Sequence, residues 1–342
     1  MNIKLWLPII SEIIEVLFYL ICVLFTIAYL TVAERKSLAY MQRRLGPNVV
    51  GWYGLLQAFA DAVKLLVKEI IIPKESNGFI LLISPMITLI TALLGWLIIP
   101  FGPALTLGDL EYGILFSLAI GSLGVFGSLL AGWGSNSKYS FLGSIRSTAA
   151  LISYELVLST VYIIILMFCS TFNLTTLIES QRVIWYCIPL LPITLLFFIS
   201  TVAETNRPPF DLTEAENELV AGFFTEYSAS PFVFFFLAEY GNVILMSAAS
   251  TILFFGGYLF PSLPITYEPT LINSLFEGIL YGASFALKLC FFMYLFIWVR
   301  ASFPRFTFDT LIKLCWTIFL PILFGLFLFV PSILFLFNSL TL

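Results

Sequence analysis

The chain has 342 residues, of which 60% are hydrophobic and 11% charged, and its formal net charge is -4. Soluble globular proteins have about a quarter of their residues charged, so this composition predicts a polytopic membrane protein. Because the chain contains no histidine, it cannot form a His-ligated haem, zinc or copper site by itself. Its five cysteines have neither metal-ligand nor redox spacing, so we expect no iron–sulfur cluster and no other metal site in this chain.

Apolar runs long enough to cross about 30 Å of hydrocarbon recur along the chain and predict about eight transmembrane helices. They cover residues 8–32, 79–100, 110–132, 149–170, 184–203, 231–259, 280–300 and 311–337. The expected fold is therefore an all-α polytopic membrane protein, with residues 1–342 forming a single membrane domain. In the third run, Gly121, Gly124 and Gly127 are expected to let another helix approach closely.

Between the first two runs, residues 54–72 have a different pattern. Asp61, Lys64 and Lys68 recur at three- and four-residue spacing with apolar residues between them. This predicts an amphipathic helix on the membrane surface. A helix packed on the surface of a partner protein is compatible with the same pattern.

Basic residues gather after alternate spans, which is the distribution expected of loops on one side of a membrane. They are Arg35, Lys36, Arg43, Arg44, Lys64, Lys68 and Lys74 after the first span, Lys138 and Arg146 after the third, Arg207 after the fifth, and Arg300 and Arg305 after the seventh. Eight spans with both termini on the opposite side fit this distribution. The basic loop, the surface helix and the segment 204–227 are thus predicted to face the same compartment.

Residues 204–227 form an acidic loop in an otherwise apolar region, with several carboxylates and one arginine. Pro208 and Pro209 cannot lie inside a helix and are expected to end the preceding span. Asp211 followed by Glu214 resembles a capping box and predicts a short helix from about residue 212. Glu214 and Glu218 would share a face of that helix, where like charges repel. The alternatives are a carboxylate cluster that titrates as a group and a solvated acidic loop.

Three charged residues fall inside predicted spans: Glu155, Glu239 and Lys288. A charge at the centre of a membrane costs about 2.5–3.5 kcal/mol on insertion scales, so such residues often mark a functional path. Glu204, at the inner end of the fifth span, would extend a line of carboxylates toward the acidic loop. We expect a proton-conducting or proton-sensing role. A structural Glu239–Lys288 ion pair is the alternative.

Several short motifs occur in an order that resembles the subunit 1 family of respiratory complex I. They are Glu34-Arg-Lys, Arg44-Leu-Gly-Pro-Asn, Gln57-Ala-Phe-Ala-Asp61, Ser153-Tyr-Glu155, Ala203-Glu-Thr-Asn-Arg-Pro-Pro-Phe-Asp-Leu212, Glu214-x-Glu216-x-Glu218, Ala238-Glu-Tyr240 and Pro304-Arg-Phe306. The resemblance runs from about residue 8 to the end. Leu45 and Trp52 depart from the family pattern, which affects only the expected contacts of the surface loop.

The resemblance implies a membrane-arm subunit of proton-pumping NADH:ubiquinone oxidoreductase, with an entrance for the isoprenoid tail framed by the first span, the surface helix and the sixth span. The implied quinone-binding residues are Arg35, Arg44, Phe59, Asp61, Arg207, Asp211, Phe232, Arg300 and Arg305. The implied proton-path and coupling residues are Glu34, Glu155, Glu204, Glu214, Glu216, Glu218, Glu226 and Glu239, to which Lys288 is added because it lies inside a span.

The same resemblance implies that this chain binds no cofactor, that ubiquinone is the substrate, and that flavin and iron–sulfur clusters lie in partner subunits. Its partners would be other membrane-arm and peripheral-arm subunits and membrane lipids, with no nucleic acid. The expected location is the mitochondrial inner membrane, with a bacterial plasma membrane as the alternative. A stand-alone ion or proton-coupled transporter and the membrane subunit of a hydrogenase-type complex are the competing functions.

Overall fold

The computed structural model describes residues 3–103, 105–211, 221–260 and 271–336, and of these the side chains of all but residues 3–9 and 271–276. Within these ranges the chain is helical, and its one β-bridge is an isolated pairing of Gly102 with Leu105. The all-α prediction is therefore confirmed. The short helix expected from about residue 212 lies outside the described residues.

Seven helical segments of the described part are long and apolar enough to cross a membrane. They are α1 (Ile3–Met41), α3 (Gly78–Leu94) extended by the 3₁₀-helix η2 (Gly95–Ile98), α4 (Gly113–Ser135), α5 (Lys138–Cys169), α9 (Ala229–Phe254), α10 (Leu271–Ser302), and a last segment in which α11 (Phe308–Lys313) continues through the π-helical η4 (Leu314–Phe319) into α12 (Leu320–Leu336). Several of these helices extend beyond the predicted apolar runs into polar sequence, as α5 does from Lys138 to Thr148.

The fifth expected span is shorter than predicted. In place of a span over 184–203 the structure has α7 (Leu191–Glu204), whose 14 residues rise only about 21 Å. Pro189 and Pro192 explain the late start, because proline has no amide hydrogen for the helical ladder and is tolerated only in the first turn. The described part of the chain thus has seven long spans and one short apolar helix, where eight long spans were expected.

The shorter elements connect these helices. They are η1 (Trp52–Gly54), α2 (Gln57–Val67), α6 (Leu174–Ser180) and η3 (Gly222–Glu226). The helix expected over 54–72 is confirmed in position but limited to α2, since the backbone is extended at Lys68. No residue of α2 is buried, although the helix contacts both α1 and α9.

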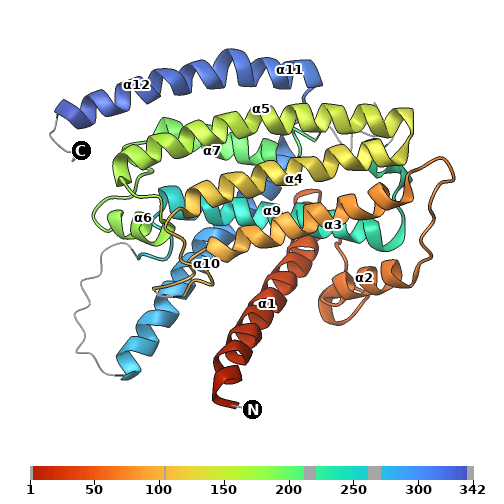
Figure 1. Cartoon of the computed structure of the whole chain (residues 1–342), viewed down its shortest axis with the longest axis horizontal. Helices are drawn as coiled ribbons and strands as arrows, with labels where there is room; N and C mark the ends of the chain where they lie inside the picture. Colours follow the sequence, from red (N-terminus) through yellow and green to blue (C-terminus); the bar gives the residue numbers. More distant parts are fainter. Residues whose placement is uncertain (1–2, 104, 212–220, 261–270, 337–342) are drawn as a thin grey trace.

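Figure 1 shows how the long helices are arranged: α3, α4, α5 and α9 run side by side, α11 and α12 lie along α5, and α1 and α10 are inclined to this layer. One continuous hydrophobic core joins them and includes the fully buried Tyr154, Phe197 and Phe254. The Tyr154 hydroxyl donates to the Leu311 carbonyl at 3.4 Å, which fixes α11 on α5. The inclined helices α1 and α10 converge toward their C-terminal ends, where the charged site lies.

The glycines of α4 have two different roles. A Cβ on Gly127 would lie 2.2 Å from Cγ2 of Thr88 in α3, so this glycine permits the close approach of two helices, as predicted. A Cβ on Gly121 would meet nothing within 4 Å, because Gly121 borders a cavity. The packing prediction is therefore wrong for Gly121.

Candidate functional site

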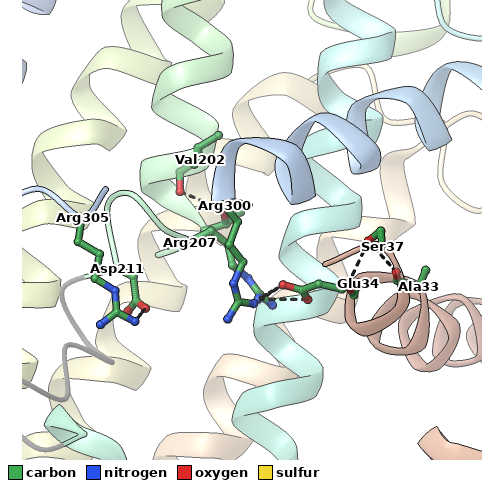
Figure 2. A network of polar contacts seen from close by, with 9 residues as sticks. Ala33, Glu34, Ser37, Val202, Arg207, Asp211, Arg300 and Arg305 are labelled. Atoms are coloured by element: carbon green, nitrogen blue, oxygen red, sulfur yellow. Dashed lines mark hydrogen bonds and ion pairs between the residues drawn. The ribbon is translucent and has the colours of Figure 1, made fainter. Parts of the chain in front are cut away.

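Three charged side chains from distant parts of the chain meet at the end of α1 (Figure 2). Glu34 lies in the last turns of α1 and is 5% exposed. Its Oε1 accepts a hydrogen bond from Nη1 of Arg207 at 3.4 Å and also pairs closely with Nη1 of Arg300 at the end of α10. The Glu34 carboxylate thus joins α1, α10 and the loop after α7.

The end of α7 places Arg207 in this position. Asn206 adopts φ +49°, a left-handed conformation that asparagine tolerates at a helix end. The Asn206 amide donates to the Ala203 carbonyl at 3.1 Å and the Arg207 amide to Val202 at 3.3 Å. Helix α7 ends at Glu204, so the prediction that the span stops before Pro208 and Pro209 is confirmed.

A second ion pair anchors the same loop to the segment after α10. Asp211 is 2% exposed, and its Oδ2 accepts from Nη2 of Arg305 at 3.3 Å. Next to this pair the rings of Phe210 and Phe306 stack, with centroids 5.5 Å apart. The ion pairs therefore bring residues 34, 207–211 and 300–305 together at one end of the bundle, as the prediction of a shared side requires.

Arg207 is held by both charge and aromatic contacts. Its guanidinium carbon lies 4.1 Å from the centre of the Tyr240 ring in α9. Burial disfavours the charged form, but attraction from Glu34, Tyr240 and Glu239 outweighs it, so the pKa of Arg207 is raised. Arg207 thus remains a fixed positive charge between Glu34 and Glu239.

The predicted residues of the surface helix form a separate, exposed group against α1. Nη1 of Arg35 lies 2.7 Å from Oδ2 of Asp61, and Nε2 of Gln57 donates to Oδ1 of Asp61 at 2.9 Å. The Phe59 ring contacts the rings of Phe25 and Tyr29 at centroid distances of 5.8 and 6.2 Å. These contacts attach α2 to α1, and α2 also contacts α9.

A cavity of about 120 Å³ lies between α3, α4, α7 and α9, and we call it the polar cavity because carboxylates, amides and hydroxyls form part of its otherwise apolar wall. Both Glu204 and Glu239 line it, and their neighbours in its wall include Asn206, Asn242 and Thr91. Within the described part of the chain, Oε2 of Glu204 is buried with no hydrogen-bond partner. A cavity of this volume is large enough to hold several water molecules, and the carboxylates and amides in its wall provide hydrogen-bond partners for them. Glu155 of α5 lies close enough to Glu204 for their charges to repel.

Lys288 belongs to α10 and lies elsewhere, against the turn that follows α9. Its ammonium donates to the carbonyls of Phe255, Gly257 and Leu259 at 2.7, 2.9 and 2.6 Å, and it lies 4.6 Å from the Trp185 ring. These carbonyls use all three N–H donors. The structure therefore shows Lys288 bound to the turn that follows α9, in place of the alternative Glu239–Lys288 ion pair.

The remaining predicted residues are not part of the triad. Arg44 is exposed and donates to Gln42 at 2.8 Å, Phe232 packs against the rings of Phe224 and Phe236, and Glu226 ends η3 partly buried. Glu214, Glu216 and Glu218 lie outside the described residues.

Sequence reasoning missed the neighbours that complete the site. Tyr240 and Asn242 follow Glu239 on α9, and Tyr240 lies against Arg207 while Asn242 borders the polar cavity. A polar amide three residues from a carboxylate in an apolar span was a signal that could have identified Asn242. Tyr240 was identified only as part of the motif Ala238-Glu-Tyr240 and was not assigned to the site, because tyrosine is common in membrane helices.

Comparison with known proteins identifies relatives over nearly the whole chain. Residues 14–331 match the family described as NADH dehydrogenase. "NADH-ubiquinone oxidoreductase chain 1" of Yarrowia lipolytica is 67% identical over 337 residues, covering 96% of this chain and 98% of the relative. The chain 1 protein of Podospora anserina is 51% identical, with 98% and 99% covered. An NADH-quinone oxidoreductase protein of Rhodospirillum centenum is 48% identical, with 90% and 89% covered.

Proposed function

Because this chain belongs to the NADH dehydrogenase family, we propose that it is the membrane-arm subunit that receives quinone in a proton-pumping NADH:ubiquinone oxidoreductase of the mitochondrial inner membrane. The observation that carries the proposal is the Glu34–Arg207–Arg300 triad, which lies between a surface helix and a polar cavity with two carboxylates. The names of the relatives do not favour a stand-alone transporter or a hydrogenase-type complex.

The proposed quinone entrance lies where α2 packs on α1. Here the apolar surface of α1 and the Phe59 ring provide contacts for an isoprenoid tail, while Arg35 and Asp61 lie beside them. Arg300 is partly exposed, so its free N–H groups can donate to a quinone carbonyl while Nη1 stays on Glu34. Arg44, Phe232, Asp211 and Arg305 belong to the surrounding wall in this proposal. The flavin and iron–sulfur clusters that deliver electrons are assigned to other subunits.

The proposed coupling path begins at the same triad. A change of charge near Arg300 alters the electrostatic potential at Glu34, and Arg207 transmits that change to Glu239, because it attracts both carboxylates. From Glu239 the polar cavity leads to Glu204 and on to Glu155. Each step is a redistribution of protons among coupled carboxylates and requires no redox group in this chain. Glu214, Glu216, Glu218 and Glu226 extend the path in the proposal, whereas the contacts of Lys288 favour a structural role.

Glu239→Gln in the assembled complex tests the coupling path. We expect NADH-driven ubiquinone reduction and proton pumping to fall about tenfold together, which corresponds to about 1.4 kcal/mol in the limiting barrier. Reduction of ferricyanide by NADH should stay normal, because it bypasses the membrane arm. The control is Glu111→Gln, which removes an exposed carboxylate before α4. Normal pumping in Glu239→Gln would refute the path.

A further inference from the structure

A narrow groove lies between α1 and α10, outside the polar cavity and the triad. Its volume is about 660 Å³, and apolar and aromatic side chains from α1, α10 and the segment around Trp96 and Phe101 form its walls. Ligand pockets commonly measure about 300–1,000 Å³ and have walls of this kind. The groove is therefore large enough to hold a ligand of considerable size.

The groove runs along both helices. On α10 its wall is a stripe at three- and four-residue spacing from Gly282 through Ala286 to Met293, and on α1 a similar stripe runs from Glu15 to Ala33. Residues at this spacing share one face of a helix. The 18 residue steps from Glu15 to Ala33 correspond to a length of about 27 Å.

The dimensions of the groove limit what can occupy it. A volume of about 660 Å³ spread over about 27 Å corresponds to a groove less than about 10 Å across. A transmembrane helix is about 10–12 Å wide and does not fit. Carbon atoms in contact lie about 3.5–4.0 Å apart, so the groove fits one hydrocarbon chain.

One end of the groove carries a charge. Among the described residues that line it, Glu15 is the charged one, and Glu12 is exposed one turn earlier on α1. Gly282 and Glu15 lie at about the same distance from the Glu34–Arg300 ion pair. Gly282 precedes Arg300 by 18 residues on α10, and Glu15 precedes Glu34 by 19 residues on α1. An acidic mouth attracts a cationic group and repels an anionic one.

We propose that this groove binds one acyl chain of a membrane phospholipid, with the amine of its head group at Glu15. The chain lies along α1 and α10 and ends near Leu30 and Met293, which also border the small cavity beside Glu34. The lipid thus fills the apolar space below the triad and keeps water away from its membrane side.

Gly282→Leu in the assembled complex tests the site, because a side chain here enters the groove and its Cβ meets nothing within 4 Å. The matched control is Gly278→Leu, one turn earlier on α10, where the Cβ also has open space and the residue does not line the groove. The probe is a phosphatidylethanolamine with a photoreactive group in its acyl chain. Cross-linked peptides of α1 and α10 are then quantified by mass spectrometry. Cys22→Leu, on the α1 wall, is a second blocking variant in case Gly282→Leu does not assemble.

We expect cross-linking to fall at least fivefold in Gly282→Leu or Cys22→Leu and to stay normal in Gly278→Leu. Glu15→Gln should reduce the preference for the amine lipid over phosphatidylglycerol by a similar factor. Equal labelling in the blocking and control variants would overturn the proposal. It would also be overturned if a photoreactive long-tailed ubiquinone labelled these peptides and the phospholipid did not.

Discussion

Removing the negative charge of Glu34 is expected to loosen the loop after α7. At the 3.4 Å separation of Glu34 and Arg207, an effective dielectric constant of about 20 gives an attraction of about 5 kcal/mol. The two side chains are 7% and 13% exposed, so Glu34→Gln leaves a buried guanidinium without its main counter-charge. Losing one partner of a buried ion pair costs about 3–5 kcal/mol, and we expect about 3 because Arg207 keeps its contact with Tyr240.

Native-state hydrogen exchange in the assembled complex measures this loss locally. The amides of Asn206, Arg207 and Phe210 donate to carbonyls of the same turn, so they exchange when the turn opens (Figure 2 shows the bond from Arg207 to Val202). A loss of about 3 kcal/mol makes exchange about 100-fold faster.

The control removes a carboxylate from an exposed pair of the same chemistry. Asp61→Asn breaks the ion pair with Arg35. The Asp61 side chain is 37% exposed and the Arg35 side chain 55%, and exposed ion pairs contribute about 0–1 kcal/mol to stability. Exchange within α2 should therefore change less than fivefold. The double variant Glu34→Gln/Arg207→Met should recover much of the lost protection, because no buried charge is left unpaired at position 207. Exchange after Glu34→Gln that matches the Asp61→Asn control would refute the reasoning.

Three further predictions concern other parts of the fold. Burial raises the pKa of Tyr227 to about 12, whereas the same hydroxyl ionises near pH 10 in the unfolded chain, so the protein loses about 2–3 kcal/mol of stability as the pH rises from 10 to 12. Tyr227→Phe should flatten this alkaline loss and should cost about 1 kcal/mol at neutral pH, because the hydrogen bond to Ser84 is lost. An unchanged pH profile of stability would contradict this. Lys288→Met removes three hydrogen bonds to carbonyls of the turn 255–259 after α9, so hydrogen exchange in this turn should become at least 100-fold faster. Exchange at the wild-type rate would leave the proton-path role as the better explanation of Lys288. Gly132→Ala places a Cβ 2.0 Å from Oγ of Ser144 in α5 and should lower the melting temperature of the complex. Gly121→Ala adds its Cβ in open space and should leave the melting temperature unchanged. Equal melting temperatures of the two variants would contradict the two glycine roles.

Composition and hydropathy were sufficient to predict the class of protein and the position of most helices. Apolar runs of about 20 residues can satisfy their backbone groups in a membrane only as helices, so composition and length predict spans without tertiary information. The ends of helices followed from local chemistry, as at Pro208 and Pro209. The position of α7 was predicted, but its start at Leu191 was not. The start depends on Pro189 and Pro192, which lie inside a continuous apolar run and therefore did not change the predicted boundary.

Which charges meet could be seen only after the helices were packed. Glu34, Arg207 and Arg300 are separated by 173 and 93 positions, and no local pattern distinguishes this combination from the many other pairings of acids and bases in the same loops. Lys288 shows the same limit, since its charge inside a span indicated a functional path, yet the fold brings three carbonyls to it. Ion pairs, cavities and grooves arise where helix faces meet. Their partners are therefore set by helix packing, which depends on contacts between residues far apart in the chain.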